Sequence, residues 1–373
     1  MTKLLRVLHV GKFYPPHPGG METHLELLCR RLAERGVEVE AVVTNHERGT
    51  VTETRDGVRV TRVGSPVSVA RASISPGMAR AIAARPADVV HFHHPNPTAV
   101  LSYLASGHPG ALVVTYHSDI VRQKVLRAVF DPVLHRFLRR AKAIIATSPN
   151  YAASSPVLRR HAERVRVIPF GIDAAHFGAA DPAEVAAIRA RHGRKIVFAA
   201  GRLVYYKGFD YLVQAMPHVR DAHLLVAGGG PLRNSLSQLA ERAGVSGRVT
   251  FLGSVPDLRP YYHAADVFAL PAVARSEAFG LVQLEAMACG LPVVNTAVDS
   301  GVPFVSPHGV TGLTVPPRDP AALADALDRL LDDAALRRFL GEAGRARATG
   351  ELGAEAMVER TVALYREISS RRE

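Results

Sequence analysis

The sequence of 373 residues contains no tryptophan and only two cysteines. Cys29 and Cys289 both fall in helical patterns and cannot form a disulfide framework, which excludes a disulfide-stapled secreted domain and suits a reducing cytosol. No apolar run approaches the length of a membrane span, and the run 4–10 is too short for a signal peptide. We therefore expect a cytoplasmic protein, with any membrane contact peripheral on the inner face of the plasma membrane.

Several short signatures of ligand binding are also absent. No G-x-G-x-x-G follows a predicted strand, which argues against a nicotinamide-dependent oxidoreductase. No zinc-finger spacing, basic tail or ribonucleoprotein motif occurs, so we expect no nucleic-acid partner. The formal net charge of +12 still indicates an anionic partner, and a nucleotide and an acidic membrane surface both remain open.

Predicted strands and helices alternate along the whole chain, and a hydrophobic content of 47% is enough to bury the cores of two domains. Such alternation is typical of α/β proteins with largely parallel sheets, in which functional residues lie where the strands end. Helices are expected at 21–35, 319–348 and 351–370. The expected strands are 4–10, 37–43, 58–63, 89–92, 112–115, 143–146, 165–168, 196–200, 224–227, 249–251, 267–270 and 292–295.

The stretch 276–292 carries two carboxylates eight positions apart. Gly280 opens a turn and the run 281–288 favours a helix, so Glu277 precedes the helix and Glu285 lies within it among apolar neighbours. At the start of such a helix the backbone amides are unpaired and suit a diphosphate, while Glu285 suits ribose hydroxyls. These amides belong to Phe279, Gly280, Leu281 and Val282. Two solvated acids on a surface helix are the alternative.

A second loop directly follows the predicted strand 196–200 and carries two cations, Arg202 and Lys207, between glycines. Cations at the end of a strand are well placed to neutralise a diphosphate leaving group.

The two loops together resemble one family. The run A-R-S-E-A-F-G-L-V-Q-L-E-A-M-A-C-G-L-P-V-V resembles the E-x7-E signature of the retaining glycosyltransferases of family 4, and G-R-L-x4-K-G matches the family's earlier loop. The similarity covers nearly the whole chain. It implies the α/β GT-B fold, in which two Rossmann-like domains face each other across a cleft and a C-terminal helix crosses back to the N-terminal domain. Residues 1–172, with a helix at about 354–373, are then the acceptor-binding domain, and residues 173–353 bind the nucleotide sugar.

The resemblance also implies roles for individual residues. Arg202 and Lys207 become donor-phosphate ligands, and Glu277 positions the donor. His117, in the run T-Y-H-S-D after the predicted strand 112–115, corresponds to a histidine that meets the donor sugar, although a structural histidine is the alternative. The expected catalytic residues are His117, Arg202, Lys207 and Glu277. The nucleotide-sugar site adds Gly19 and Gly20 of P-P-H-P-G-G-M-E, Gly230 of G-G-G-P, Val255 where the base would rest, and the helix start with Glu285.

Family 4 transfer implies front-side displacement with retention, in which positioning and charge stabilisation do the work. A nucleophilic role for Glu277 stays open. No D-x-D occurs, so we expect neither a metal nor another cofactor. The expected donor is GDP-mannose, and the acceptor is lipid-linked or a saccharide in exopolysaccharide, O-antigen or glycolipid synthesis. A UDP-sugar-dependent transferase, a GT-B sugar-nucleotide epimerase and a non-enzymatic adaptor are the alternatives.

Two further segments carry weaker signals. Basic and apolar residues interleave in 120–142, which suits either an anionic membrane surface or a solvated helix face, and Pro132 is expected to break the run. In 88–95, His91 and His93 alternate onto one face without a carboxylate or cysteine partner, so we expect packing or an acceptor-side loop and no zinc.

Overall fold

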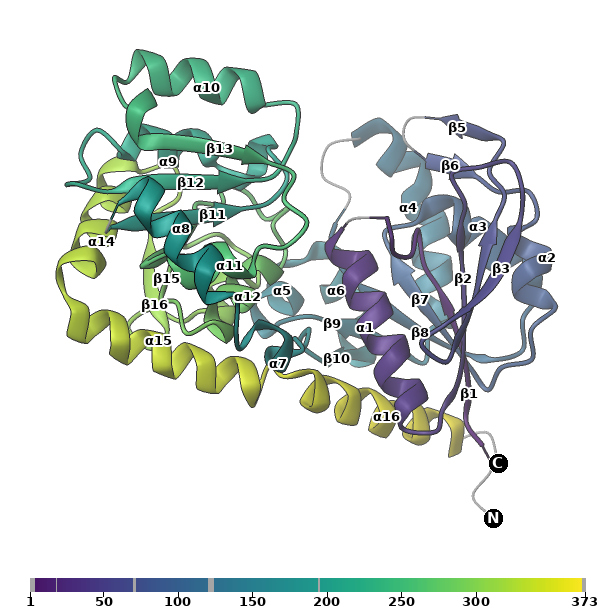
Figure 1. Ribbon diagram of the computed structural model, residues 1–373. Helices are drawn as coiled ribbons and strands as arrows, with labels where there is room; N and C mark the ends of the chain where they lie inside the picture. The colour runs from purple at the N-terminus through teal and green to yellow at the C-terminus, as the bar shows by residue number, and fades with distance from the viewer. Residues whose placement is uncertain (1–3, 18, 70–71, 120–123, 194, 371–373) are drawn as a thin grey trace. The chain divides into compact units, whose positions relative to one another are not determined.

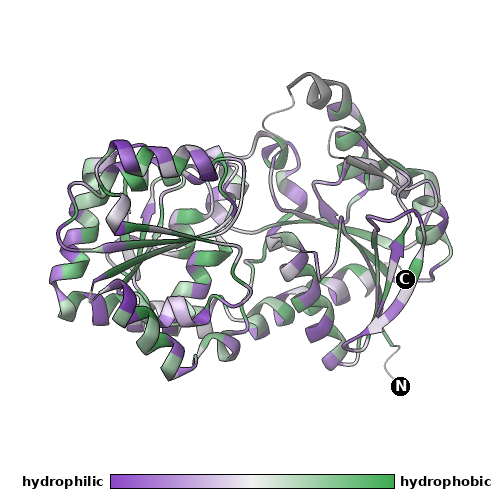
Figure 2. Cartoon of the chain, turned by 45° about the horizontal axis from the view of Figure 1, so that its top comes forward, coloured by the Kyte–Doolittle hydropathy of each residue, from purple (hydrophilic) through white to green (hydrophobic). Residues whose placement is uncertain are grey.

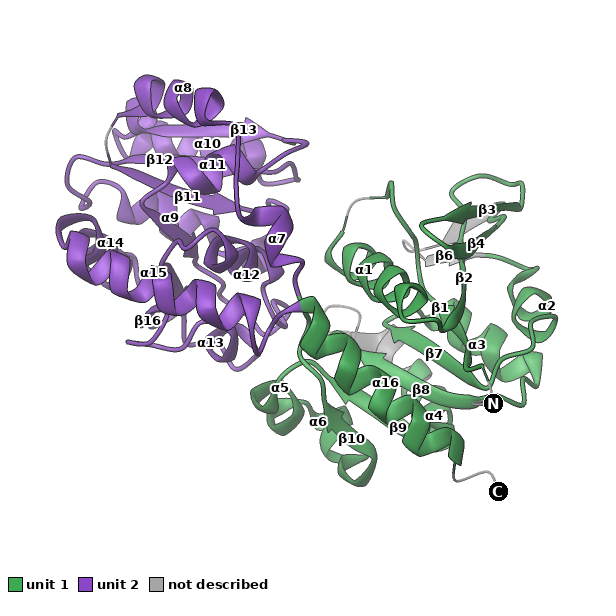
Figure 3. Cartoon of the chain, turned by 60° about the horizontal axis from the view of Figure 1, so that its bottom comes forward, with its two compact units in different colours: residues 1–171, 354–373 green, residues 172–353 purple. Residues whose placement is uncertain are grey.

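The computed structural model describes residues 4–17, 19–69, 72–119, 124–193 and 195–370. The chain divides into two compact units, residues 1–171 with 354–373 and residues 172–353 (Figure 3). Each unit is a largely parallel sheet with helices on both faces (Figure 1). The central strands of both sheets are largely hydrophobic, whereas the helices carry a mixture of hydrophobic and hydrophilic residues (Figure 2).

The sheet of the first unit has the strand order β10-β9-β8-β7-β1-β2-β4-β3 and is parallel except for β3. Its strand order reverses between β1 and β7, and ligands bind at the carboxyl ends of the strands at such a switch point. A separate antiparallel pair is formed by β5 (Val67–Val69) and β6 (Ala72–Ile74). The strands of the large sheet are β1 (Arg6–Val10), β2 (Glu38–Thr44), β3 (Val51–Arg55), β4 (Val58–Val63), β7 (Val89–His94), β8 (Ala111–Tyr116), β9 (Ala143–Ala146) and β10 (Val165–Val167).

Helices cover both faces of this sheet, with α1 and α16 on one face and α3 and α4 on the other (Figure 1). Apart from the short 3-10 turn Ala162–Arg164, the helices are α1 (Gly20–Glu34), α2 (Met78–Ala83), α3 (Pro97–Ser106), α4 (Lys124–Arg140), α5 (Pro149–Ser154), α6 (Pro156–Arg159) and α16 (Ala354–Ser370). None of the helices in the described ranges combines the length and the apolar character that crossing a membrane requires.

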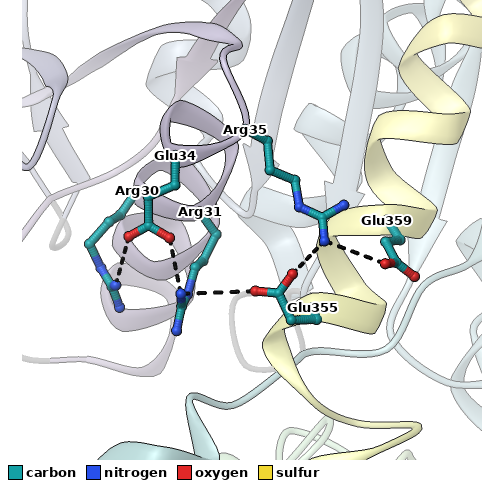
Figure 4. Close-up of polar contacts among 6 residues, drawn as sticks. All are labelled: Arg30, Arg31, Glu34, Arg35, Glu355 and Glu359. Carbon is teal, nitrogen blue, oxygen red and sulfur yellow. Dashed lines mark hydrogen bonds and ion pairs between the residues drawn. The ribbon is translucent and has the colours of Figure 1, made fainter.

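The last helix, α16, belongs to the first unit and packs against α1. Arg35 pairs with Glu355 and, at 3.4 Å, with Glu359 at the solvent-exposed edge of this contact (Figure 4). Exposed ion pairs contribute at most about 1 kcal/mol. The buried side chains of Met357 and Tyr365 each contribute roughly 1.5 to 3 kcal/mol, so apolar burial holds the helix in place.

The sheet of the second unit is entirely parallel, with the order β13-β12-β11-β14-β15-β16. In chain order this is 3-2-1-4-5-6, the arrangement of a Rossmann sheet, and its switch point lies between β11 and β14. The strands are β11 (Ile196–Ala200), β12 (His223–Ala227), β13 (Val249–Gly253), β14 (Val267–Leu270), β15 (Val293–Thr296) and β16 (Gly312–Val315). The helices are α7 (Ala174–Phe177), α8 (Pro182–His192), α9 (Phe209–Ala215), α10 (Arg233–Arg242), α11 (Arg259–Ala264), α12 (Leu281–Ala288), α13 (Val302–Val305), α14 (Pro320–Asp332) and α15 (Ala334–Thr349), with 3-10 turns at Tyr205–Lys207 and Ser246–Arg248.

Two helix predictions need correction. The expected helix 319–348 is two helices, because the Asp333 carboxylate accepts a hydrogen bond from the amide of Leu336 at 2.8 Å and starts α15 anew. The C-terminal helix begins at Ala354, as the domain assignment of about 354–373 expected, and three residues later than the helix 351–370 expected from the sequence pattern.

The prediction that Pro132 breaks the basic run is also wrong, since α4 continues through it. A proline inside a helix costs about 3 kcal/mol through its missing amide and its ring. Leu134, Phe137 and Leu138, which follow it, are buried against the unit and offset this cost.

Candidate functional site

Two loops at the carboxyl edge of the second sheet place a cation beside a carboxylate. Lys207 ends the loop after β11 and Glu277 lies on the loop after β14, the two strands that flank the switch point. The Lys207 Nζ lies 2.8 Å from Glu277 Oε2, and each residue is only 8% exposed. A buried ion pair rarely stabilises a fold more than an apolar pair of the same size. Its place at the switch point therefore indicates a binding site for a charged ligand.

The backbone holds these two loops against each other. The amide of Val273 donates to the carbonyl of Tyr206 at 2.9 Å. Gly208 has a φ of 66°, and a Cβ atom there would lie 2.0 Å from the carbonyl oxygen of Pro271. Only glycine permits this approach, so the sequence Lys207-Gly208 fixes the ammonium group beside the second loop.

Arg202 lies on the same loop as Lys207, exposed to solvent and without an ion pair to any residue in the described ranges. The amide of Leu203 donates to the carbonyl of Gly229 at 2.9 Å, which joins this loop to the one after β12 that contains Gly230. Val255 is half-buried on the loop after β13. The structure thus brings the predicted nucleotide-binding residues of this unit to one edge of one sheet.

The start of α12 supplies donors at the same edge. Gly280 precedes the helix with a φ of 78°, and the amides of Leu281 and Val282 in the first turn have no intrahelical carbonyl to bond. Behind them Gln283 is fully buried and donates to the carbonyls of Phe279, at 2.9 Å, and Val302, at 3.1 Å. These bonds fix the backbone that leads into the helix.

Glu285 is held by a tyrosine. The hydroxyl of Tyr262 on α11 donates to Glu285 Oε2 at 2.8 Å and lies 3.2 Å from the carbonyl oxygen of Val282. Burial raises the pKa of Glu285, while the Tyr262 hydrogen bond and the Lys207 charge oppose that rise. The carboxylate is therefore oriented before any ligand binds.

Sequence reasoning missed Tyr262 and Gln283. A glutamine on the buried side of an apolar helix was the available signal for Gln283, because a buried amide needs fixed partners. Nothing in the sequence distinguishes Tyr262 from an ordinary core tyrosine, since its partner Glu285 is 23 positions away.

In the first unit, His117 directly follows β8 and is 5% exposed. Its amide donates to the carbonyl of His94 at 2.9 Å, and its Nε2 lies 3.0 Å from Nδ1 of His93. Gly19 immediately precedes α1 and Gly20 begins it, on the loop that leaves β1 at the switch point. His24, one turn further along α1, has its ring centroid 5.5 Å from that of His117.

The weaker predictions fall mostly outside these loops. Of the basic stretch 120–142, residues 120–123 lie outside the described residues, while Arg136, Arg139 and Arg140 are exposed on α4. His91 and His93 lie within β7 and are buried, and they join His9 in the one group of metal-ligand type found among the described residues.

Comparison with known proteins gives two family matches that together cover most of the chain. The model described as Glycosyltransferase Family 4 matches residues 18–176, and the model described as Glycosyl transferases group 1 matches residues 194–333. The second match contains the paired loops of Lys207 and Glu277.

Similar proteins span almost the whole chain. The O-antigen chain mannosyltransferase C of Escherichia coli is 31% identical over 97% of this chain and 98% of its own length. A GDP-mannose-dependent alpha-(1-6)-phosphatidylinositol monomannoside mannosyltransferase of Mycobacterium tuberculosis is 32% identical over 93% of this chain and 94% of its own. Among solved structures, a sucrose-phosphate synthase from Thermosynechococcus elongatus aligns with a TM-score of 0.83 and 27% identity, over 98% of this chain and 100% of that one.

Proposed function

Because this chain belongs to glycosyltransferase family 4 and is a hexosyltransferase with two Rossmann-like units of the GT-B fold, we propose that it transfers mannose from GDP-mannose. The acceptor is lipid-linked or a saccharide of cell-surface polysaccharide or glycolipid synthesis. Transfer proceeds with retention of anomeric configuration and without a metal ion. In this proposal the second unit binds the nucleotide sugar and the first unit binds the acceptor.

The observation that carries the proposal is the Lys207–Glu277 pair at the switch point, with the start of α12 beside it. In the donor complex Lys207 and Arg202 bind the diphosphate, and the amides of Leu281 and Val282 add two neutral donors. Negative charge grows on the diphosphate as the glycosidic bond breaks, so these groups stabilise the transition state more than the bound donor.

The carboxylates act on the other parts of the donor. Glu277 accepts hydrogen bonds from the sugar hydroxyls, and Glu285 accepts hydrogen bonds from the ribose. With two cations and the helix start present, charge stabilisation needs no metal bridge, in keeping with the missing D-x-D motif. His117 meets the donor sugar from the first unit, and Gly19 and Gly20 let the backbone approach the substrates closely.

The choice of donor is supported by the relatives. The M. tuberculosis relative is named as GDP-mannose-dependent, and the E. coli relative as a mannosyltransferase. A UDP-sugar remains the second choice because Val255, the residue expected beside the base, has an apolar side chain that cannot distinguish guanine from uracil by hydrogen bonding. The exposed basic side chains of α4 suit a cytoplasmic protein that binds peripherally to an anionic membrane while it receives a lipid-linked acceptor.

A donor screen followed by product analysis tests this function. Thermal-shift measurements with GDP-mannose, GDP, UDP-glucose and UDP should show the largest stabilisation with the guanine nucleotides, because a ligand raises apparent stability with its saturation. Transfer from GDP-mannose to a mannosyl lipid or a short mannoside is then measured in the presence of EDTA. The one-bond carbon–hydrogen coupling at the new anomeric carbon should show an α-linkage, as in the donor.

Each part of the proposal can fail separately. Stabilisation by UDP-sugars alone would show that the donor is a UDP-sugar and not GDP-mannose. A β-linked product would show that the transfer does not retain the anomeric configuration. Loss of transfer in EDTA that manganese restores would remove metal independence. Conversion of the donor without an acceptor would indicate an epimerase instead.

A further inference from the structure

A buried carboxylate lies at the start of α1 in the first unit. Glu22 is the third residue of this helix and is only 6% exposed. The loop before α1 leaves β1, one of the two strands that flank the switch point of this sheet. Ligands bind at the carboxyl ends of the strands at such a point, so Glu22 lies where a substrate of the first unit is expected.

The charge of Glu22 has little compensation within the described part of the chain. Its own backbone amide donates a hydrogen bond to it, and the charge of Lys12 attracts it, but no ion pair within 4 Å joins it to a described cation. Burial raises the pKa of Glu22, which reflects the cost of keeping a charge in the interior. A buried carboxylate without a paired cation destabilises a fold, so its presence at the switch point indicates a binding role.

The carboxylate of Glu22 occupies the space beside Gly19. A Cβ atom at Gly19 would lie 2.2 Å from Glu22 Oε2, so only a glycine leaves room for the carboxylate in this position. Gly19 and Gly20 are both exposed. The carboxylate therefore lies against exposed backbone, and a ligand that approaches over the two glycines meets it.

The helix starts at the switch points of the two units differ in charge. The first turn of α12 has no acidic residue, whereas the first turn of α1 carries Glu22. The start of α12 therefore presents amides alone and suits a diphosphate, while the carboxylate at the start of α1 repels a phosphate group. An ionised carboxylate only accepts hydrogen bonds, so the ligand groups that suit Glu22 are hydroxyls.

We infer that Glu22 binds the acceptor by accepting hydrogen bonds from its sugar hydroxyls, and that the start of α1 takes a neutral saccharide and not a phosphate group. The inference rests on the proposed function, in which the first unit binds the acceptor. Two neighbouring hydroxyls of one sugar ring match the two oxygens of a carboxylate, so the ligand is a saccharide with a vicinal diol. The charge of Lys12 favours the ionised carboxylate that these hydrogen bonds require.

The variant Glu22→Gln tests this role. Glutamine keeps the size of the side chain and removes a buried charge, so the variant should fold. Loss of a hydrogen bond to a charged group should raise KM for a short mannoside acceptor about tenfold to 100-fold, and calorimetry should show a change in GDP affinity of less than about twofold. Glu26→Gln is the matched control, because Glu26 lies one turn further along α1 and pairs with Arg30 at 3.4 Å, and it should change neither constant.

The variant Gly19→Ala moves the carboxylate without removing it. The added methyl group would overlap Glu22 Oε2, and the end of a flexible side chain can move aside, so the fold should persist. KM for the mannoside should rise as it does in Glu22→Gln. Because both changes act through one carboxylate, the double variant should be no worse than the weaker single variant, whereas independent effects would multiply.

Any of three results overturns the inference. An unchanged KM in Glu22→Gln with a shifted urea midpoint would show that the carboxylate only caps α1. Multiplying effects in the double variant would show that Gly19 acts independently of Glu22. Tighter GDP binding by Glu22→Gln would show that the start of α1 faces the donor diphosphate, because removing a repulsive charge strengthens phosphate binding.

Saturation-transfer NMR of mannoside binding separates this inference from the proposed function. If the wild type binds the mannoside, Glu22→Gln does not, and neither protein transfers sugar, the inference stands and the proposed function fails. If Glu22→Gln transfers mannose as well as the wild type does, the inference fails and the proposed function stands.

Discussion

At Lys207, one ammonium group is expected to neutralise the leaving diphosphate, while its only charged partner within 4 Å among the described residues is Glu277, at 2.8 Å. Lys207→Ala should lower kcat/KM about 100-fold to 1000-fold, as for loss of a group that stabilises transition-state charge. Lys195→Ala is the matched control, because Lys195 lies before β11, at the opposite end of the strand, and pairs with Asp332. Initial-rate kinetics should show less than about a twofold change for the control.

Unfolding curves must accompany these rates, because Lys207→Ala leaves the buried Glu277 carboxylate without its cation. The double variant Lys207→Ala with Glu277→Gln removes that penalty. Full stability of the double variant with unimpaired transfer would rule out the assigned role of the pair.

Tyr262 is the second residue at which a single hydrogen bond can be tested. Tyr262→Phe removes the bond to Glu285 while keeping the buried ring, so nucleotide affinity should fall roughly fivefold to tenfold. Calorimetry with GDP and UDP measures this. Tyr261→Phe is a neighbouring control whose hydroxyl has no hydrogen bond to a described residue, and an equal loss in both variants would show that Glu285 is not the cause.

For individual residues, the sequence indicated which residue types form the candidate site but not which of them contact one another. The sequence was sufficient to predict the four charged residues of the site, because charged groups at strand ends and helix starts have few structural uses. These residues are Arg202, Lys207, Glu277 and Glu285. The contact of Glu285 with Tyr262 could not be predicted from the sequence, since it depends on how α11 and α12 pack. The roles of all these residues in transfer remain predictions.

Among the elements, the start of α12 depends on the backbone conformation of one glycine. Gly280 has a φ of 78°, and a Cβ atom there would lie 2.6 Å from Leu270 Cδ2. Gly280→Ala should cost about 1 to 2 kcal/mol for the left-handed backbone and a further 1 to 3 kcal/mol for the overlap. It should also displace the amides of the helix start and weaken nucleotide binding.

Gly244→Ala separates the two costs of this change. Gly244 has a similar φ of 69°, but a Cβ atom there would meet nothing within 4 Å. Urea unfolding should show the backbone cost in both variants, and calorimetry should show weaker nucleotide binding only in Gly280→Ala. Equal effects on binding would mean that the helix start does not contact the ligand.

The prediction of helices and strands succeeded where a whole strand is buried. It failed where an element is exposed or where a single tertiary or capping contact determines its ends. β11 was readable as a continuous apolar run because a parallel strand is covered on both faces. The edge strand β3 is exposed at all five positions, so its sequence carries no hydrophobic signal. The break between α14 and α15 depends on one cap at Asp333, and the uninterrupted helical composition around it concealed that break.

For the whole molecule, the alternation of strands and helices was sufficient to predict an α/β fold with two parallel sheets, and this is confirmed. The strand order, which creates the switch points, does not follow from alternation alone. It follows from the resemblance, because the same linear pattern fits several doubly wound orders.

The two units should differ in their resistance to acid, because buried neutral histidines are concentrated in the first unit. Burial lowers the pKa of His9, His24 and His94 to about 3, and that of His91, His93 and His117 well below the usual range. Their unfolded pKa is about 6.5, so below that pH the unfolded chain binds protons that the folded unit cannot. Their contribution to the free energy of unfolding of the first unit is complete above about pH 6.5. It is lost as the pH falls, by up to about 1.4 kcal/mol for each histidine and each pH unit.

Hydrogen exchange between pH 7 and pH 4 should therefore show loss of protection in β1, β7 and β8 before β11 and β12, whose unit holds only half-buried or exposed histidines in its described residues. His94→Phe provides the sharpest control. Neither nitrogen of the His94 ring has a hydrogen-bond partner among the described residues, and the ring stacks on Tyr116 at 4.8 Å, so phenylalanine keeps the packing and removes one titrating group. The variant should lower the pH at which the first unit opens. An unchanged transition, or earlier opening of the second unit, would show that groups other than the buried histidines set the acid limit.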